Sequence, residues 1–195
     1  MKVKTFYSCN TAHGLIGSSK YLLGHIEDDE LFRNNNKYSF ILVSAATLES
    51  LLNDGIISWA FHTFKSDDYK RHAQAFLSMN LVKKLDALGF LLSSGVYVTD
   101  NTSATYQTLS NLVKLRNEVA HSKDFYSETE MEYGAVNEDG MQEIKFPQDM
   151  IAKMSKSPLN ISNEDCLGIV YCLEHLQQVL KNEVDYSDTE LFKIL

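Results

Sequence analysis

Hydrophobic residues recur at helical spacing along most of this chain. The clearest pattern runs from Lys37 to about Phe64, where apolar side chains follow i, i+3 and i+4 spacing and predict one long helix. Gly55 either divides this helix or is tolerated within it. The residues of the predicted buried face are Phe40, Ile41, Ser44, Ala45, Leu48, Leu51 and Leu52.

The same pattern predicts two helices in the first half of the chain besides the long one. A short helix is expected over residues 20–32, with a break at the asparagines of positions 34–36. Another helix is expected over residues 68–92, ending at Ser93, Ser94 and Gly95. Its apolar face comprises Leu77, Leu81, Leu85 and Leu88, and its polar positions include Lys83, Lys84 and Asp86.

Two helices are predicted in the second half. One covers residues 103–121, and the other runs from about Asn163 to Val184 with Ser162 or Asn163 as its N-cap. Between them lies an insertion, residues 122–161, in which an Asp139-Gly140 turn separates two alternating runs. This insertion is expected to form a small β-hairpin or a mobile loop. The fold class is therefore all-α: a four- to five-helix bundle over residues 1–195, with its core at about 37–184.

Length and composition fit a soluble protein. The chain has 195 residues, of which 44% are apolar and 23% charged, as in ordinary globular domains. Its longest apolar stretch, residues 41–52, is broken by Ser44, Thr47, Glu49 and Ser50, so no window resembles the roughly 18 apolar residues of a membrane span. The start MKVKTFYSCN lacks the apolar core of a signal peptide. We expect a cytoplasmic protein that does not contact a membrane.

Cysteine usage and charge limit the chemistry further. Cys9, Cys166 and Cys172 have no disulfide-type spacing, and on a helix the last two point to different faces. Buried free thiols are expected, with no metal and no cofactor. The net charge of −8 argues against non-specific coating of nucleic acid, whereas a local basic site, a basic partner or self-association stays open.

The segment LRNEVAH, residues 115–121, holds the candidate chemistry. Arg116 and His121 are five residues apart, so on a helix their side chains leave about 140° apart, whereas Asn117 and His121 share a face. One interpretation is an ordinary helix end, with a histidine near the carbonyl end of the dipole and an arginine paired with a carboxylate. The other is catalytic. An imidazole can transfer a proton near neutral pH, and a guanidinium can hold a phosphate, as metal-free cleavage of RNA requires.

The segment RNEVAH resembles the R-x4-6-H motif of the HEPN superfamily, whose members usually carry a polar residue directly after the arginine. The motif's place at the end of a late helix, followed by a loop and a further helix, is also similar, and SAATLESLLND resembles the family's first long helix. The resemblance covers about residues 37–184, and its most specific part is the six residues of the motif. It implies an all-α bundle, a homodimer with two motifs facing a shared cleft, and metal-independent endoribonuclease activity. Such enzymes are often toxins or anti-phage effectors, so an antitoxin partner protein is one implied partner besides the RNA substrate.

Carried over by position, the resemblance makes Arg116 the residue that stabilises the phosphate, His121 the catalytic histidine and Asn117 the supporting polar residue. Glu49 and Tyr126 are candidate supporting residues. Glu49 is otherwise a solvated carboxylate on a helix face, and Tyr126, like Tyr133, either stacks on a base or packs in its loop. Some HEPN proteins do no chemistry, so the alternative function is a dimeric module that binds a nucleotide or a protein partner.

Other motifs carry weaker signals. His62 and His72 lack a second ligand pair, which favours exposed histidines over metal ligands. TAHGLIGSSK, with His13, contains glycines but not the full spacing of a phosphate-binding loop. His175 lies on an apolar segment and is expected at the edge of the core.

Overall fold

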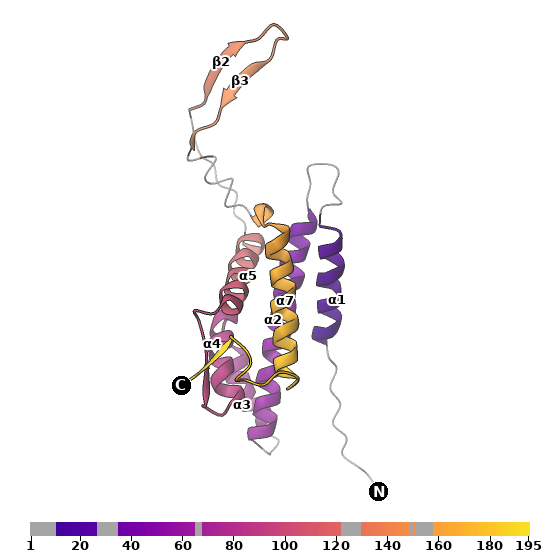
Figure 1. The fold of residues 1–195 in the computed structure, drawn as a ribbon, viewed down its shortest axis with the longest axis vertical. Coiled ribbons are helices and arrows are strands. Elements are labelled where there is room, and N and C mark those ends of the chain that lie inside the picture. The colour runs from indigo at the N-terminus through magenta and orange to yellow at the C-terminus, as the bar shows by residue number, and fades with distance from the viewer. Residues whose placement is uncertain (1–10, 27–34, 65–67, 122–129, 149, 151–157) are drawn as a thin grey trace.

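The long helix predicted between Lys37 and Phe64 is the centre of the fold. The computed structural model describes residues 11–26, 35–64, 68–121, 130–148, 150 and 158–195. Within them the chain is mostly helical, so the predicted all-α class is confirmed. Its α-helices are α1 (Thr11–Gly24), α2 (Asn35–Thr63), α3 (Tyr69–Leu77), α4 (Leu81–Leu92), α5 (Ala104–Ala120) and α7 (Asn163–Leu180). Helix α2 contacts each of the others (Figure 1).

The predicted apolar stripe of α2 is buried, and the helix is continuous through Gly55. A Cβ atom at Gly55 would lie 2.8 Å from Cδ2 of Leu180, so the glycine is tolerated because α7 packs closely there. One apolar cluster joins α1, α2, α4, α5 and α7, and a second, smaller cluster packs α3 against α2 and α4. The fully buried side chains of the first cluster include Phe40, Ile41, Leu48 and Leu52 of α2, Leu85 and Leu88 of α4, Leu109 and Leu112 of α5, and Leu173 and Leu176 of α7.

From the sequence, no window was expected to resemble a membrane span, and for α2 this expectation was wrong. By length and composition alone, Asn36–Thr63 would suffice to cross a membrane, with a mean hydropathy of 1.4 in its most apolar window. Ser44 and Thr47 do not interrupt it, because both side chains are fully buried and hydrogen-bonded. However, 56% of that window is buried inside the bundle, as the central helix of a packed core requires.

Two predicted helices differ in extent from the observed ones. The segment 68–92 forms two helices, α3 and α4, because Asn80 caps the second: its Oδ1 accepts a hydrogen bond of 2.9 Å from the backbone N–H of Lys83. The helix predicted over residues 20–32 overlaps the end of α1, which begins at Thr11 and ends at Gly24, and residues 27–32 of that prediction lie outside the described residues. The predicted break at 34–36 was also wrong in part, because α2 already begins at Asn35.

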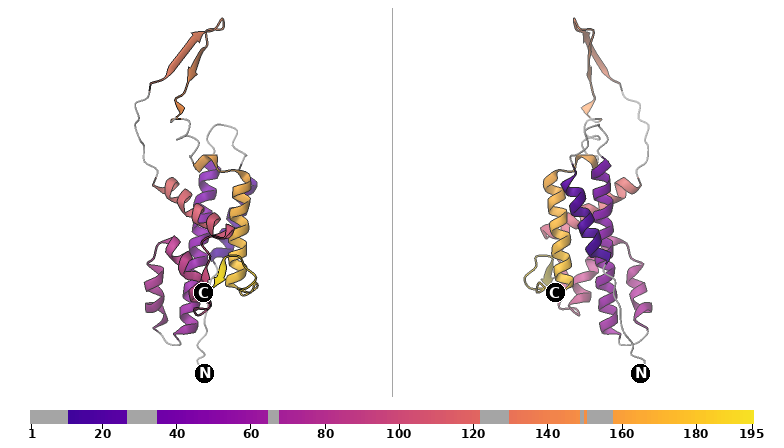
Figure 2. Two further views of the ribbon diagram at one scale, coloured as in Figure 1. Left: turned by 60° about the vertical axis from the view of Figure 1, so that its left-hand side comes forward. Right: turned by 90° about the vertical axis from the view of Figure 1, so that its right-hand side faces the viewer.

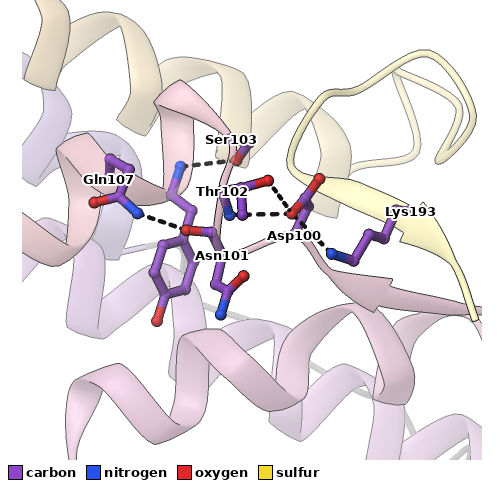
Figure 3. A network of polar contacts seen from close by, with 7 residues as sticks. Asp100, Asn101, Thr102, Ser103, Gln107 and Lys193 are labelled. Atoms are coloured by element: carbon purple, nitrogen blue, oxygen red, sulfur yellow. Dashed lines mark hydrogen bonds and ion pairs between the residues drawn. The ribbon is translucent and has the colours of Figure 1, made fainter.

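Two short strands that the sequence did not reveal fasten the C-terminal segment to the bundle. Strand β4 (Phe192–Ile194) pairs antiparallel with β1 (Tyr97–Thr99), Tyr97 lying opposite Ile194. Beside them, Asp100 Oδ1 accepts hydrogen bonds from the backbone N–H and the hydroxyl of Thr102 (Figure 3). The same oxygen forms an ion pair of 3.0 Å with Nζ of Lys193. These contacts hold the N-terminal end of α5, where Ser103 is the N-cap and its Oγ accepts a hydrogen bond from the Tyr106 N–H.

The predicted hairpin in the insertion is confirmed. Strands β2 (Glu132–Val136) and β3 (Gln142–Lys145) pair antiparallel, with Gly140 in the turn at a φ of +77°. The hairpin projects beyond the end of the bundle at which α5 ends and α7 begins (Figures 1 and 2). A short 3-10 helix, η1 (Pro158–Asn160), precedes α7, whose N-cap is Ser162 as predicted.

Candidate active site

The predicted motif lies at the C-terminal end of α5. Buried Leu109, Leu112 and Val113 fix the face of α5 that packs on the core. The helix ends at Ala120, and His121 is its C-cap, with its backbone N–H donating to the Asn117 carbonyl at 2.9 Å. The His121 side chain is exposed. The position predicted for the motif, in the last turn of a late helix, is therefore correct.

Arg116 is hydrogen-bonded to its own neighbour. Its Nη1 donates to Oδ1 of Asn117 at 3.0 Å, and its side chain is half-buried. Among the described residues, no carboxylate lies within ion-pair distance of Arg116. The carboxylate partner expected for an ordinary helix end is thus not found there, and the guanidinium keeps donors available for an anion.

Arg116 and Asn117 line an open cavity of about 370 Å³. Its other polar residues are Glu49 of α2 and Asn80, the cap of α4. Its apolar residues are Met79, Leu81, Val82 and Val113. The site thus forms where α2, α4 and α5 meet, and His121 is not among the lining residues. Glu49, predicted as a supporting residue, lines the same cavity as Arg116.

Lys84 is a charged residue near this cavity that sequence reasoning placed wrongly. It was assigned to the polar face of its helix, yet it is only 3% exposed. Its Nζ donates to Oδ1 of Asn53 at 2.8 Å and lies 3.9 Å from Oε1 of Glu49. The signal was present in the sequence, since Lys84 is three residues after Leu81 and four before Leu88, which is core spacing.

The remaining candidates do not join the site. Tyr126 and Cys9 lie outside the described residues. Tyr133 is 62% exposed in β2, opposite Ile144. The glycine-containing segment with His13 is helical, so the phosphate-loop alternative is wrong.

The other histidines and cysteines that the sequence singled out, where the structure describes them, do not line this cavity. His62 is exposed and bonded to the Ser58 carbonyl, whereas His72 stacks on Phe64. His175 is half-buried and bonded to Thr189. Cys166 and Cys172 are buried free thiols as predicted, and burial raises the pKa of Cys166 to about 11. Among the residues that the structure describes, no three His, Cys, Asp or Glu side chains gather as metal ligands.

Comparisons with protein-family models, with curated proteins and with solved structures give no match to this chain. Its candidate function therefore depends on the chemistry of the residues around Arg116 and on the resemblance of RNEVAH to the HEPN motif.

Proposed function

We propose that this chain is a metal-independent endoribonuclease of the HEPN type that acts as a homodimer. The observation that carries the proposal is the Arg116–Asn117 hydrogen bond at a cavity, with the exposed His121 as the C-cap of the same helix. The bond uses one guanidinium N–H and leaves the others for a phosphate. The placement of this pair at the end of α5 agrees with the motif that the sequence contains.

The reaction needs two proton transfers and stabilisation of a charged phosphate. His121 accepts the proton of the ribose 2′-hydroxyl, and the 2′-oxygen forms a bond to the adjacent phosphorus. The bond from phosphorus to the 5′-oxygen breaks, and that oxygen leaves with a proton from a second acid. Arg116 stabilises the negative charge on the phosphate oxygens. The products are a 2′,3′-cyclic phosphate and a 5′-hydroxyl.

A single copy of the motif supplies one imidazole, whereas the two proton transfers call for both a base and an acid. A second copy related by a twofold axis would supply another His121 as the acid. The proposed dimer therefore places the two α5 ends opposite each other. A toxin or an anti-phage effector is the role we propose for such an enzyme, with RNA as substrate and an antitoxin protein as a further partner.

One observation favours the alternative, a module that binds a nucleotide or a protein partner without chemistry. His121 does not line the cavity that Arg116, Asn117 and Glu49 share. A ligand could therefore be held by the cavity alone. This alternative predicts binding that His121→Ala leaves unchanged.

The test is an RNA-cleavage assay in EDTA with the wild type, Arg116→Ala and His121→Ala. The proposal expects 2′,3′-cyclic phosphate ends with the wild type and a loss of about 10²- to 10³-fold or more with either variant. His62→Ala is the matched control, because His62 is exposed near the far end of α2. Equal cleavage by the wild type and His121→Ala would overturn the catalytic role proposed for His121. If the folded dimer cleaves no RNA of a broad panel, the ribonuclease proposal is overturned and the binding module is the function that remains.

A further inference from the structure

The cavity beside α5 carries two opposite charges from two different helices. Arg116 comes from α5 and Glu49 from α2, and both line the same space. A ligand that satisfies both needs an anionic group for the guanidinium and hydrogen-bond donors for the carboxylate. Met79, Leu81 and Val82 add apolar walls that a flat ring can contact. A nucleotide combines these three properties.

Glu49 is held beside a buried cation. The ammonium of Lys84 lies 3.9 Å from Oε1 of Glu49 and gives its hydrogen bond to Asn53 instead. At that distance Lys84 attracts the carboxylate without occupying its lone pairs as a hydrogen-bond donor. The Glu49 side chain is 46% exposed, so a ligand can reach it. The site therefore presents a carboxylate that accepts hydrogen bonds and has a fixed charge behind it.

The nucleobases differ in the donors that they offer to a carboxylate. Guanine has two adjacent donors on its Watson–Crick edge, N1–H and the N2 amino group. Adenine and cytosine each place an acceptor nitrogen beside their amino group, and uracil has one N–H between two carbonyls. An acceptor facing a carboxylate is left unsatisfied and repelled. Two parallel hydrogen bonds to Glu49 are available to guanine alone.

We propose that this cavity is a guanine-nucleotide site, in which Glu49 accepts from N1–H and N2–H and Arg116 binds the 3′-phosphate. The volume of about 370 Å³ lies in the range of small-molecule sites and suits one nucleotide. Together with the proposed ribonuclease function, on which this consequence rests, the site implies cleavage on the 3′ side of guanosine. The binding site itself does not require that function.

The first experiment measures binding without cleavage. Guanosine 3′-monophosphate and its adenosine, cytidine and uridine counterparts are titrated calorimetrically into the full-length wild type. We expect the guanosine compound to bind about tenfold or more tightly than the others, as one bidentate base contact provides. Glu49→Gln should abolish the preference, because an amide presents one acceptor and one donor in place of two acceptors.

Glu183→Gln is the matched control, since Glu183 is an exposed carboxylate that follows α7 and does not line the cavity. It should keep the preference for guanosine. A thermal unfolding curve of Glu49→Gln checks that the variant is folded. Equal affinity for the four nucleotides, or a preference that survives in Glu49→Gln, overturns the proposal.

The second experiment separates this proposal from the ribonuclease function. RNA oligonucleotides that differ only in the base 5′ of the scissile phosphate are cleaved by the wild type and by Glu49→Gln. Cleavage confined to guanosine in the wild type and relaxed in the variant supports both proposals. Cleavage without base preference overturns the guanine site and leaves the nuclease. Glu49-dependent binding of guanosine 3′-monophosphate without any cleavage supports the guanine site and overturns the nuclease.

Discussion

Arg116 Nη1 donates a hydrogen bond of 3.0 Å to Oδ1 of Asn117, its neighbour in the sequence. Adjacent residues of a helix normally point in directions about 100° apart, so the long guanidinium turns toward the amide at the exposed end of α5. The amide thereby limits the positions that the guanidinium adopts at the cavity. Asn117 is a positioning residue for Arg116 in the proposed reaction.

Removal of this amide should therefore weaken cleavage less than removal of the guanidinium. We expect Asn117→Ala to lower kcat/KM for RNA about 3- to 10-fold, as the loss of a hydrogen bond worth about 1 kcal/mol gives. Asn117→Asp should lower it more, because its carboxylate would pair with Arg116 and compete with the phosphate. Asn111→Ala, an exposed site on the same helix, is the control. Wild-type rates for Asn117→Ala would show that Arg116 needs no such support.

Lys84 should tolerate an apolar replacement better than a reversal of charge. In Lys84→Met the methionine fills the space of the lysine stem, but Asn53 Oδ1 loses its donor. We expect the free energy of unfolding to fall by about 1–2 kcal/mol. Lys84→Glu should cost more, since it buries a negative charge beside Glu49. Urea unfolding measures both against Lys83→Met, an exposed neighbour expected to change stability by less than about 0.5 kcal/mol.

Two glycines in helices should respond in opposite ways to alanine. A Cβ atom at Gly89 would lie 2.7 Å from the backbone N of Thr99, so α4 and β1 would have to separate. We expect Gly89→Ala to lower the free energy of unfolding by about 3 kcal/mol. At Gly168 of α7 nothing lies within 4 Å of the added atom, so Gly168→Ala should raise it by about 0.5–1 kcal/mol. Chemical denaturation of the two variants checks this; a stable Gly89→Ala protein would contradict the close packing.

The Asp100 network should make stability depend on pH in the acid range. Hydrogen bonds from Thr102 and the neighbouring Lys193 lower the pKa of Asp100 from 3.8 to about 2. Because the folded-state pKa is lowered, the carboxylate stabilises the fold above pH 4, and this contribution is lost as the pH falls toward 2. The stability difference between the wild type and Asp100→Asn should therefore be constant between pH 7 and 5 and shrink below pH 4. Urea unfolding at pH 7, 5 and 3 measures it.

The control for this prediction is Asp139→Asn, which changes a carboxylate in the exposed turn between β2 and β3. Its stability should follow the wild type at all three values of pH. A difference for Asp100→Asn that grew on acidification would contradict the sign of the pKa shift.

Local patterns in the sequence determined much of the fold. The spacing of apolar residues predicted α2, α5 and α7 because each of these helices buries one continuous face. The Asp139-Gly140 turn predicted the hairpin, since turn geometry depends on the residues of the turn itself. The sequence also placed Arg116, Asn117 and His121 at the end of a helix, because that too is a local property.

Only the tertiary structure decided which of these residues share a site. Glu49, Asn80 and Arg116 meet because three helices from separate parts of the chain pack together, and no local pattern encodes that meeting. Lys84 has the spacing of a core position on α4, but its ammonium can be buried there because Asn53, on another helix, accepts its hydrogen bond. Pairing of β1 with β4 likewise joins segments far apart in the chain, each too short to show a period of its own. Local spacing fixes what each segment can become, and packing between distant segments fixes which side chains face a common ligand.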